Sequence, residues 1–175
     1  RVLGVVIPTV EEALARSRTK RIGVIATEGT VASNSFQIEL RKLDPTVQVF
    51  QQGCPLLVPI IECGEQDGVV ADLMLQKYLA PILAQDIDTL ILGCTHYSIL
   101  KNKIQTRLAP QVEIICSGEV TAMKLADYLR RHPEIDRRLS RGGQRRYLTT
   151  DLTPRFQDLA SLFMGEEIQA EVVQL

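Results

Sequence analysis

The chain has 175 residues, 45% of them hydrophobic, and its 20 basic and 21 acidic residues leave a net charge of −1. This length suffices for one α/β domain, or for one domain with part of a second. The balanced charge gives no reason to expect a nucleic-acid partner. No apolar run reaches the roughly 18 residues that a membrane span needs, and no signal-peptide pattern opens the chain. We therefore expect a soluble cytoplasmic protein with no membrane partner.

Short apolar runs alternate with amphipathic segments along most of the chain. The runs are rich in Val and Ile, which predicts strands at Leu3–Ile7, Arg21–Ala26, Val47–Gln51, Thr89–Leu92 and Glu113–Cys116. Helical spacing predicts helices at Val10–Arg18, Val31–Leu43, Val69–Ala84, Ser98–Leu108 and Val120–Arg131. This alternation is typical of an α/β fold with a mainly parallel sheet flanked by helices.

Both ends of the chain point to a larger protein. Arg1 runs directly into the first predicted strand, and a natural N-terminus rarely begins inside a buried strand. The basic, turn-rich segment Arg137–Arg146 is a phosphate-binding loop or, more simply, a solvated connection. After it come a strand, a helix and a strand, predicted at Arg146–Thr149, Pro154–Phe163 and Glu171–Val173. We expect residues 1–117 to form one α/β domain and residues 118–175 to belong to a second, partly present domain.

The cysteines favour neither a zinc site nor disulfides. Their spacing matches no common zinc framework, and no CxxC pair occurs among Cys54, Cys63, Cys94 and Cys116. Without secretory signals, disulfides are not expected. A small buried apolar residue is the default interpretation of each cysteine.

Cys94 is the exception. An apolar strand ends at Gly93, and a thiol, a hydroxyl and an imidazole follow as Cys94, Thr95 and His96. In open parallel sheets, ligands bind beyond the carboxyl ends of the strands. We expect Cys94 to lie near backbone amides and a helix start. These surroundings would lower the pKa of its thiol from about 8.5 toward neutrality. Thr95 and His96 can donate hydrogen bonds to a carboxylate or relay a proton. The alternative is a buried cysteine with coincidental polar neighbours.

Two further segments carry candidate binding residues. Thr27 and Thr30 follow a predicted strand at a helix N-terminus, where an anion is favoured, although Thr is also an ordinary cap. Ser33 could serve either role. Glu62 ends an apolar stretch and is either a partly buried carboxylate or a surface residue after a core segment.

Taken in order, these segments resemble glutamate racemases of the aspartate/glutamate racemase family. Leu92-Gly93-Cys94-Thr95-His96-Tyr97 resembles the signature around that family's second catalytic cysteine. The threonine-bearing and central segments of the family are matched by Ile22–Thr30 with Ser33 and by Cys54–Glu62, while Gly4–Pro8 resembles its interdomain crossing. The resemblance covers nearly the whole chain as the C-terminal two-thirds of such an enzyme, and it weakens toward the end.

The resemblance implies two facing, pseudo-symmetric α/β domains, each of which supplies one thiol. One thiolate removes the α-proton of glutamate and the opposite thiol returns it, with no cofactor and no metal. Cys94 and His96 would be catalytic; the substrate-binding candidates are Thr95, Thr27, Thr30 and Glu62. The product D-glutamate would feed peptidoglycan synthesis, and hence cell-wall biogenesis and cell shape.

Three departures from the family pattern qualify this implication. The segment with the first catalytic cysteine is absent, so we expect the 175 residues to be inactive alone. Ser98 stands where a proline is common, and Cys116 where an aspartate is frequent. An apolar face exposed from Val120 onward would favour a homo-oligomer.

Other functions remain open at this point. The main alternative is a non-enzymatic ligand-binding or regulatory α/β domain, followed by an aspartate racemase. A thiol-based metal or redox protein would need a third ligand beside Cys94 and His96.

Overall fold

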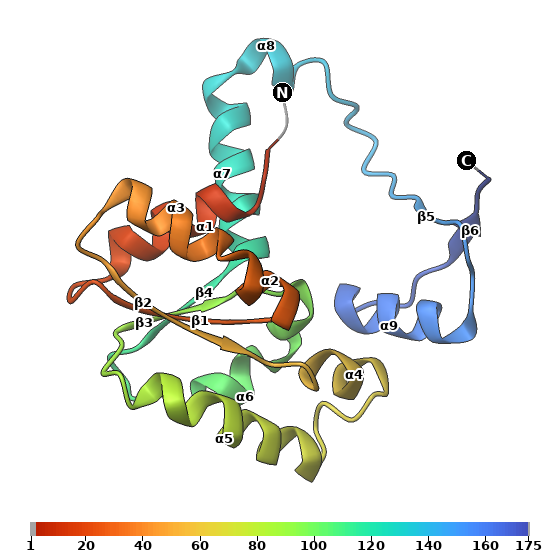
Figure 1. Ribbon diagram of the computed structural model, residues 1–175. Coiled ribbons are helices and arrows are strands. Elements are labelled where there is room, and N and C mark those ends of the chain that lie inside the picture. The colour runs from red at the N-terminus through yellow and green to blue at the C-terminus, as the bar shows by residue number, and fades with distance from the viewer. Residues whose placement is uncertain (1–2, 175) are drawn as a thin grey trace. The chain divides into compact units, whose positions relative to one another are not determined.

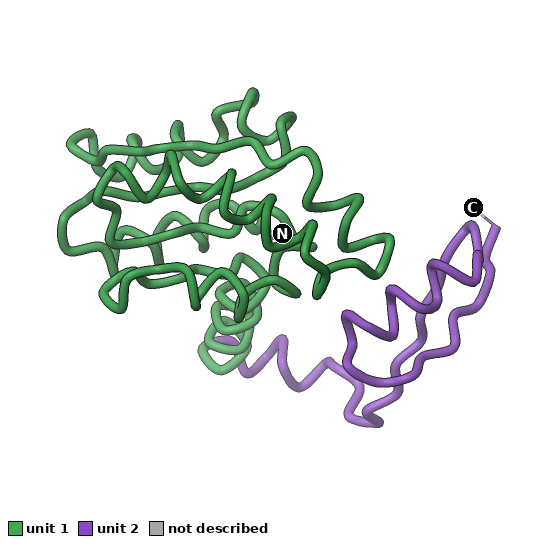
Figure 2. Tube along the Cα trace, turned by 90° about the horizontal axis from the view of Figure 1, so that it is seen from below, with its two compact units in different colours: residues 1–131 green, residues 132–175 purple. Residues whose placement is uncertain are grey.

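The computed structural model describes residues 3–174, in two compact units (Figure 2). Unit 1 is Arg1–Arg131 and unit 2 is His132–Leu175. Unit 1 thus extends beyond the boundary expected after residue 117. The reason is that helix α7 (Ser117–Arg131) packs on α1 (Val6–Arg16). Val120 joins the hydrophobic cluster of α1, and Lys124 Nζ lies 3.5 Å from Glu11 Oε2.

A four-stranded parallel sheet forms the centre of unit 1, which confirms the predicted fold class. Its strands lie in the order β2-β1-β3-β4, and they are β1 (Arg21–Ala26), β2 (Gln48–Gly53), β3 (Thr89–Leu92) and β4 (Glu113–Cys116). The predictions for β1, β3 and β4 are confirmed, and β2 begins and ends slightly later than expected. Because all four strands run the same way, their carboxyl ends share one edge of the sheet.

Helices cover both faces of this sheet (Figure 1). On one face lie α1, α3 (Ser35–Leu43) and α7, and α2 (Glu28–Ser33) precedes α3. The other face is covered by α4 (Leu57–Glu62), α5 (Val69–Leu83), the 3₁₀-helix η1 (Thr95–Leu100) and α6 (Lys101–Gln105). This arrangement buries the strands on both sides, as their continuous apolar sequences require.

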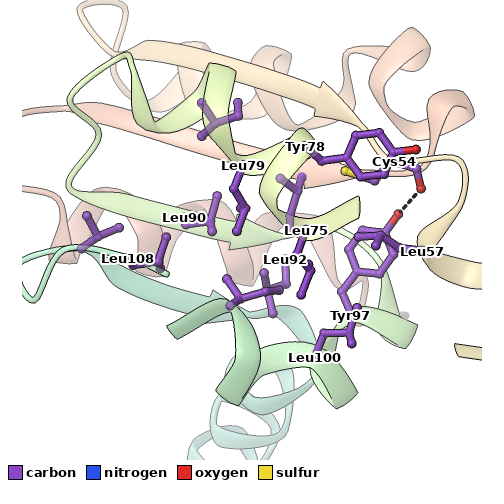
Figure 3. Close-up of a cluster of buried hydrophobic side chains, with 14 of the residues drawn as sticks. Cys54, Leu57, Leu75, Tyr78, Leu79, Leu90, Leu92, Tyr97, Leu100 and Leu108 are labelled. Atoms are coloured by element: carbon purple, nitrogen blue, oxygen red, sulfur yellow. Dashed lines mark hydrogen bonds between the residues drawn. The ribbon is translucent and has the colours of Figure 1, made fainter. Parts of the chain in front are cut away.

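The strand alternation divides the core into two clusters. In β3, Leu90 and Leu92 face α5 and η1, whereas Ile91 faces α1 and α3. Figure 3 shows the first cluster, in which Leu75, Leu79 and Tyr97 pack against these two leucines. The side-chain period of two therefore fixes which face each residue of β3 supplies.

The predicted strand Leu3–Ile7 is wrong, because α1 begins at Val6. Its buried residues, Thr9, Val10 and Ala13, recur at helical spacing, and Pro8 is tolerated in the first turn. Leu3, Val5 and Ile7 are exposed. A run of apolar residues at a helix start has the same composition as a buried strand.

Two other predicted helices are interrupted. Asn34, in the left-handed region with a φ of 53°, separates α2 from α3 inside the predicted helix Val31–Leu43. Asn adopts this conformation more readily than most residues. The predicted helix Ser98–Leu108 divides into η1 and α6, which ends at Gln105.

Unit 2 contains the short helix α8 (Pro133–Asp136) and a small β-α-β arrangement. Strands β5 (Tyr147–Thr149) and β6 (Ala170–Val172) pair in parallel, and α9 (Pro154–Met164) connects them. These elements agree closely with the predicted strand, helix and strand. Thr153 caps α9 by accepting a hydrogen bond from the Phe156 N–H at 3.1 Å.

The basic segment Arg137–Arg146 lies in unit 2, where three of its arginines pair with carboxylates. Arg145 and Arg146 pair with Glu166 and Glu171 at 3.1 and 2.7 Å, and Arg141 pairs with Asp136. These partners favour a solvated connection over a phosphate-binding loop. Within residues 3–174, no helix has both the length and the apolar character to cross a membrane.

Candidate active site at the carboxyl edge of the sheet

The register of the sheet brings Thr27, Cys54 and Cys94 to one level. Ala26 pairs with Gly53 and Ile25 pairs with Leu92, so the residues that follow lie at matching heights. Thr27 after β1, Cys54 after β2 and Cys94 after β3 therefore form a row at the carboxyl edge. Polar groups in such a row are placed where open α/β sheets bind ligands.

Gly93 allows the end of β3 to lie close to β1. Its N–H donates to the Ile25 carbonyl at 2.8 Å. A Cβ at this position would lie 3.0 Å from the Phe36 ring and 3.1 Å from Ala26 Cβ. Only glycine therefore fits without displacement, and this close approach sets where the next residue, Cys94, leaves the strand.

Cys94 is half-buried between the sheet and η1. Burial raises the pKa of its thiol, and the backbone N–H groups of His96 and Tyr97 offset only part of that effect. The expectation of a lowered pKa is thus wrong for this chain, because desolvation of the sulfur outweighs the nearby amides. A neutral thiol can donate a proton as it stands, but it needs a base to become a nucleophile or to abstract one.

The imidazole of His96 and the carboxylate of Glu62 lie in line with this thiol. Cys94 Sγ lies 3.9 Å from His96 Nδ1, and His96 Nε2 lies 3.2 Å from Glu62 Oε1. Glu62 is the last residue of α4, so the carboxylate comes from a separate element. In the tautomer with its proton on Nε2, His96 donates to Glu62, and Nδ1 can accept from the thiol. The three groups form a thiol–imidazole–carboxylate chain that can move a proton.

Thr27 and Thr30 form the turn at the start of α2. Thr27 Oγ1 accepts a hydrogen bond from the Thr30 N–H at 3.3 Å, and the two hydroxyls lie 3.0 Å apart. Thr27 is therefore a helix cap in this structure, and both side chains are half-buried. Ser33 bonds to the Thr30 carbonyl at 2.7 Å, and Thr95 is exposed beside Cys94.

Two residues at this edge gain a role that the sequence did not single out. Cys54 is fully buried, and burial raises the pKa of its thiol to about 12, as expected of a core cysteine. Its backbone carbonyl accepts a hydrogen bond from the Tyr97 hydroxyl at 3.0 Å. The hydroxyl of Tyr97, a buried residue directly after His96, was the available signal for this contact.

Among residues 3–174, no group of three or more His, Cys, Asp or Glu side chains is arranged to hold a metal ion.

Comparison with known proteins gives consistent matches. Residues 2–125 match the family described as Asp/Glu/Hydantoin racemase. A glutamate racemase of Persephonella marina is 39% identical over 99% of this chain and 64% of its own length. One from Syntrophus aciditrophicus is 38% identical, with the same 99% and 64% coverage. The chain thus spans slightly less than two thirds of these relatives.

Solved structures agree with the sequence matches. Glutamate racemase isoform RacE1 from Bacillus anthracis superposes with a TM-score of 0.88 at 35% identity, covering 99% of this chain and 65% of that one. Glutamate racemase from Francisella tularensis, solved in complex with D-glutamate, has a TM-score of 0.85 at 29% identity, covering 97% and 62%.

Proposed function

This chain belongs to the Asp/Glu/Hydantoin racemase family, and from that premise we propose that it supplies one thiol of a cofactor-independent glutamate racemase. The observation that carries the proposal is the chain from Cys94 through His96 to Glu62, with spacings of 3.9 and 3.2 Å. The related proteins named as glutamate racemases support the choice of substrate.

In the proposed reaction, Cys94 exchanges a proton with the α-carbon of glutamate. For one enantiomer, His96 Nδ1 first accepts the thiol proton, and the thiolate then takes the α-proton. An opposing thiol delivers a proton to the other face of the planar carbanion. For the other enantiomer, Cys94 is the donor, and its neutral thiol already carries the proton. General acid–base help of this kind contributes roughly 10²–10⁴-fold.

Glu62 has an electrostatic role in this scheme. When His96 accepts the thiol proton, the imidazole becomes positively charged, and the carboxylate at 3.2 Å stabilises that charge. The contact also favours the tautomer with its proton on Nε2, in which Nδ1 can accept the proton of the Cys94 thiol. The backbone N–H groups of His96 and Tyr97 separately offset part of the burial that raises the pKa of the thiol.

We further assign substrate contacts to Thr95, Thr27 and Thr30. Thr95 is exposed beside the sulfur, and the turn of Thr27 and Thr30 lies at the end of the neighbouring strand. Their hydroxyls can bond the carboxylates or the ammonium group of an amino acid. Donors near the α-carboxylate are needed, because negative charge develops there as the α-proton leaves.

The opposing thiol would come from outside these 175 residues, since the chain spans 64% of its relatives. The 175 residues alone would then lack racemase activity. Apolar side chains exposed in unit 2, including Phe156 and Phe163, support self-association in that state. The complete enzyme would make D-glutamate in the cytoplasm of a bacterium, and this D-glutamate would feed peptidoglycan synthesis.

Exchange of the α-proton of D- and L-glutamate in D₂O, followed by proton NMR, tests the proposal. We expect no exchange with the 175 residues alone, and exchange once they are joined to the segment that completes a full-length relative. In the completed protein, Cys94→Ser should reduce exchange of the enantiomer whose α-proton Cys94 takes by at least about 10²-fold, because the base for that enantiomer is lost. The matched control is Cys63→Ser, which removes an exposed thiol. Unchanged exchange of both enantiomers in Cys94→Ser would refute the role of this sulfur.

A further inference from the structure

The segment that carries Cys94 and His96 must be held in a fixed position for the two side chains to meet. The hydrogen bonds within the segment contribute little to holding it there. Thr95–Leu100 is a six-residue 3₁₀-helix, whose hydrogen-bond geometry is poorer than that of an α-helix. Thr95 and Ser98 are exposed and Cys94 is half-buried. The side chains that anchor this segment are Tyr97 and Leu100, both buried in the cluster below the sheet.

Tyr97 is the anchor with a polar contact. Its ring is fully buried, and its hydroxyl donates to the Cys54 carbonyl at 3.0 Å, the dashed line in Figure 3. The same carbonyl accepts the N–H of Leu57, the first residue of α4, at 3.3 Å. A single carbonyl therefore joins η1 to the start of α4.

The Cys54 carbonyl thus connects the two elements that carry His96 and Glu62. His96 precedes Tyr97 directly, and Glu62 is the last residue of α4. The 3.2 Å contact of His96 with Glu62 spans these two elements. We propose that Tyr97 is a positioning residue, which holds η1 against α4 so that His96 reaches Cys94 and Glu62 together.

The proposal deepens the function proposed above and rests on Cys94 being its reactive thiol. Loss of the Tyr97 hydroxyl would leave the Cys54 carbonyl buried with one donor fewer and would let η1 move against α4. The imidazole would then hold Cys94 and Glu62 less well, and the thiolate would lose the stabilisation that the imidazole provides. A less stabilised thiolate reacts more slowly at neutral pH.

The test measures how fast Cys94 is alkylated by iodoacetamide as a function of pH in the 175-residue chain, with each cysteine followed by peptide mass spectrometry. The variants are Tyr97→Phe, which keeps the ring, and Tyr78→Phe, which removes a hydroxyl from the same buried cluster. His96→Gln and the double variant Tyr97→Phe/His96→Gln complete a cycle. Cys63, which is exposed, gives an internal reference rate in every sample.

We expect Tyr97→Phe to slow alkylation of Cys94 at pH 7.5 by about fivefold and to move its pH midpoint upward, as the loss of one net hydrogen bond implies. Tyr78→Phe and the Cys63 rate should be unchanged. In the His96→Gln background, Tyr97→Phe should add little, because it acts through the imidazole. An unchanged midpoint, an equal effect of Tyr78→Phe or a fully additive double variant would overturn the proposal.

The alkylation rates can be interpreted independently of misfolding and of racemase activity. Circular dichroism establishes that each variant is folded, and if Tyr97→Phe is not, all profiles are repeated in sucrose, which favours the compact state. The readout needs no racemase activity. A failed glutamate exchange with a shifted alkylation profile would leave the positioning role standing, and the reverse outcome would leave the proposed function standing.

Discussion

The two ends of strand β3 use polar groups in opposite ways. Before the strand, Asp88 is buried and its carboxylate accepts four hydrogen bonds, at 2.6 Å from Ser17 Oγ, 2.7 Å from the Arg18 N–H, 2.6 Å from the Thr19 N–H and 3.0 Å from Thr89 Oγ1. After the strand, Cys94 is half-buried and its contact with His96 is 3.9 Å long.

Asp88 and Cys94, six positions apart, therefore differ in role: the first stabilises the fold and the second is available for chemistry. Burial disfavours the charge on Asp88, but the hydrogen bonds from Ser17, Thr19 and Thr89 outweigh it and lower the pKa of the carboxyl to about 2. At the other end, burial wins and the pKa of the Cys94 thiol is raised. A group whose bonds are all made inside the chain stabilises the fold, whereas a group with long contacts and some exposure is available to a substrate.

The largest effect should come from Asp88→Asn. The new amide carries N–H groups toward donors that the carboxylate now accepts from, so we expect the free energy of unfolding at pH 7 to fall by about 3 kcal/mol. Urea unfolding followed by circular dichroism measures this loss. Alkylation of Cys94 in the folded variant should not change. Asp86→Asn is the matched control, since Asp86 is exposed and Asn tolerates its φ of 48°.

The same variant gives a pH test of the comparison. The pKa of Asp88 in the folded chain, about 2, lies below the ordinary 3.8, so its contribution is present above about pH 4 and is lost as the pH falls toward 2. The shift corresponds to about 2 kcal/mol. The native chain should lose this stability between pH 4 and 2 by about that amount, and Asp88→Asn should lose less over the same interval. Parallel pH curves for the two proteins would contradict the assignment.

A smaller loss of stability is expected at the carboxyl edge from Gly93→Ala. The added Cβ would press on the Phe36 ring at 3.0 Å and on the Ile25 carbonyl at 3.2 Å, which should cost about 2 kcal/mol. The alkylation rate of Cys94 should change as well, because the strand end must move. In Gly118→Ala a Cβ meets nothing within 4 Å, so that control should stay within about 0.5 kcal/mol of the native chain. A harmless Gly93→Ala would show that close packing does not place the sulfur.

The smallest effect on stability should come from Glu62→Gln. The carboxylate is 40% exposed, so its pairing with His96 contributes little to folding, and we expect a change below about 0.5 kcal/mol. The alkylation of Cys94 at pH 7.5 should nevertheless slow by about twofold to threefold, because a neutral amide stabilises the imidazolium less. Urea unfolding and iodoacetamide kinetics on one preparation measure both. A large loss of stability would place Glu62 with Asp88 as a structural residue.

Much of the fold could be predicted because buried parallel strands are short apolar runs between polar boundaries. This pattern located Arg21–Ala26, Thr89–Leu92 and Glu113–Cys116 without error. The run Leu3–Ile7 failed because periodicity over five residues does not distinguish a strand from the first turn of a helix.

The site could be predicted in part for a related reason. Cys94 and His96 are close in the sequence, so their association was readable, and Glu62 was identified only as a candidate carboxylate at the end of an apolar stretch. Its 3.2 Å contact with His96 depends on how α4 packs beside η1, which local sequence does not encode. The direction of the Cys94 pKa was missed for the same reason, since desolvation depends on the packing around the sulfur.

The alternation of β3 has a consequence for how this strand can change. Leu90 and Leu92 enter one cluster and Ile91 the other, and Cys94 follows in the same phase as the two leucines. Inserting or deleting one residue would exchange the two sides, exposing the sulfur to the opposite layer of helices while it disrupts both clusters. The strand can therefore gain or lose residues only two at a time. The alternation that keeps both hydrophobic clusters intact thus also fixes the orientation of the thiol.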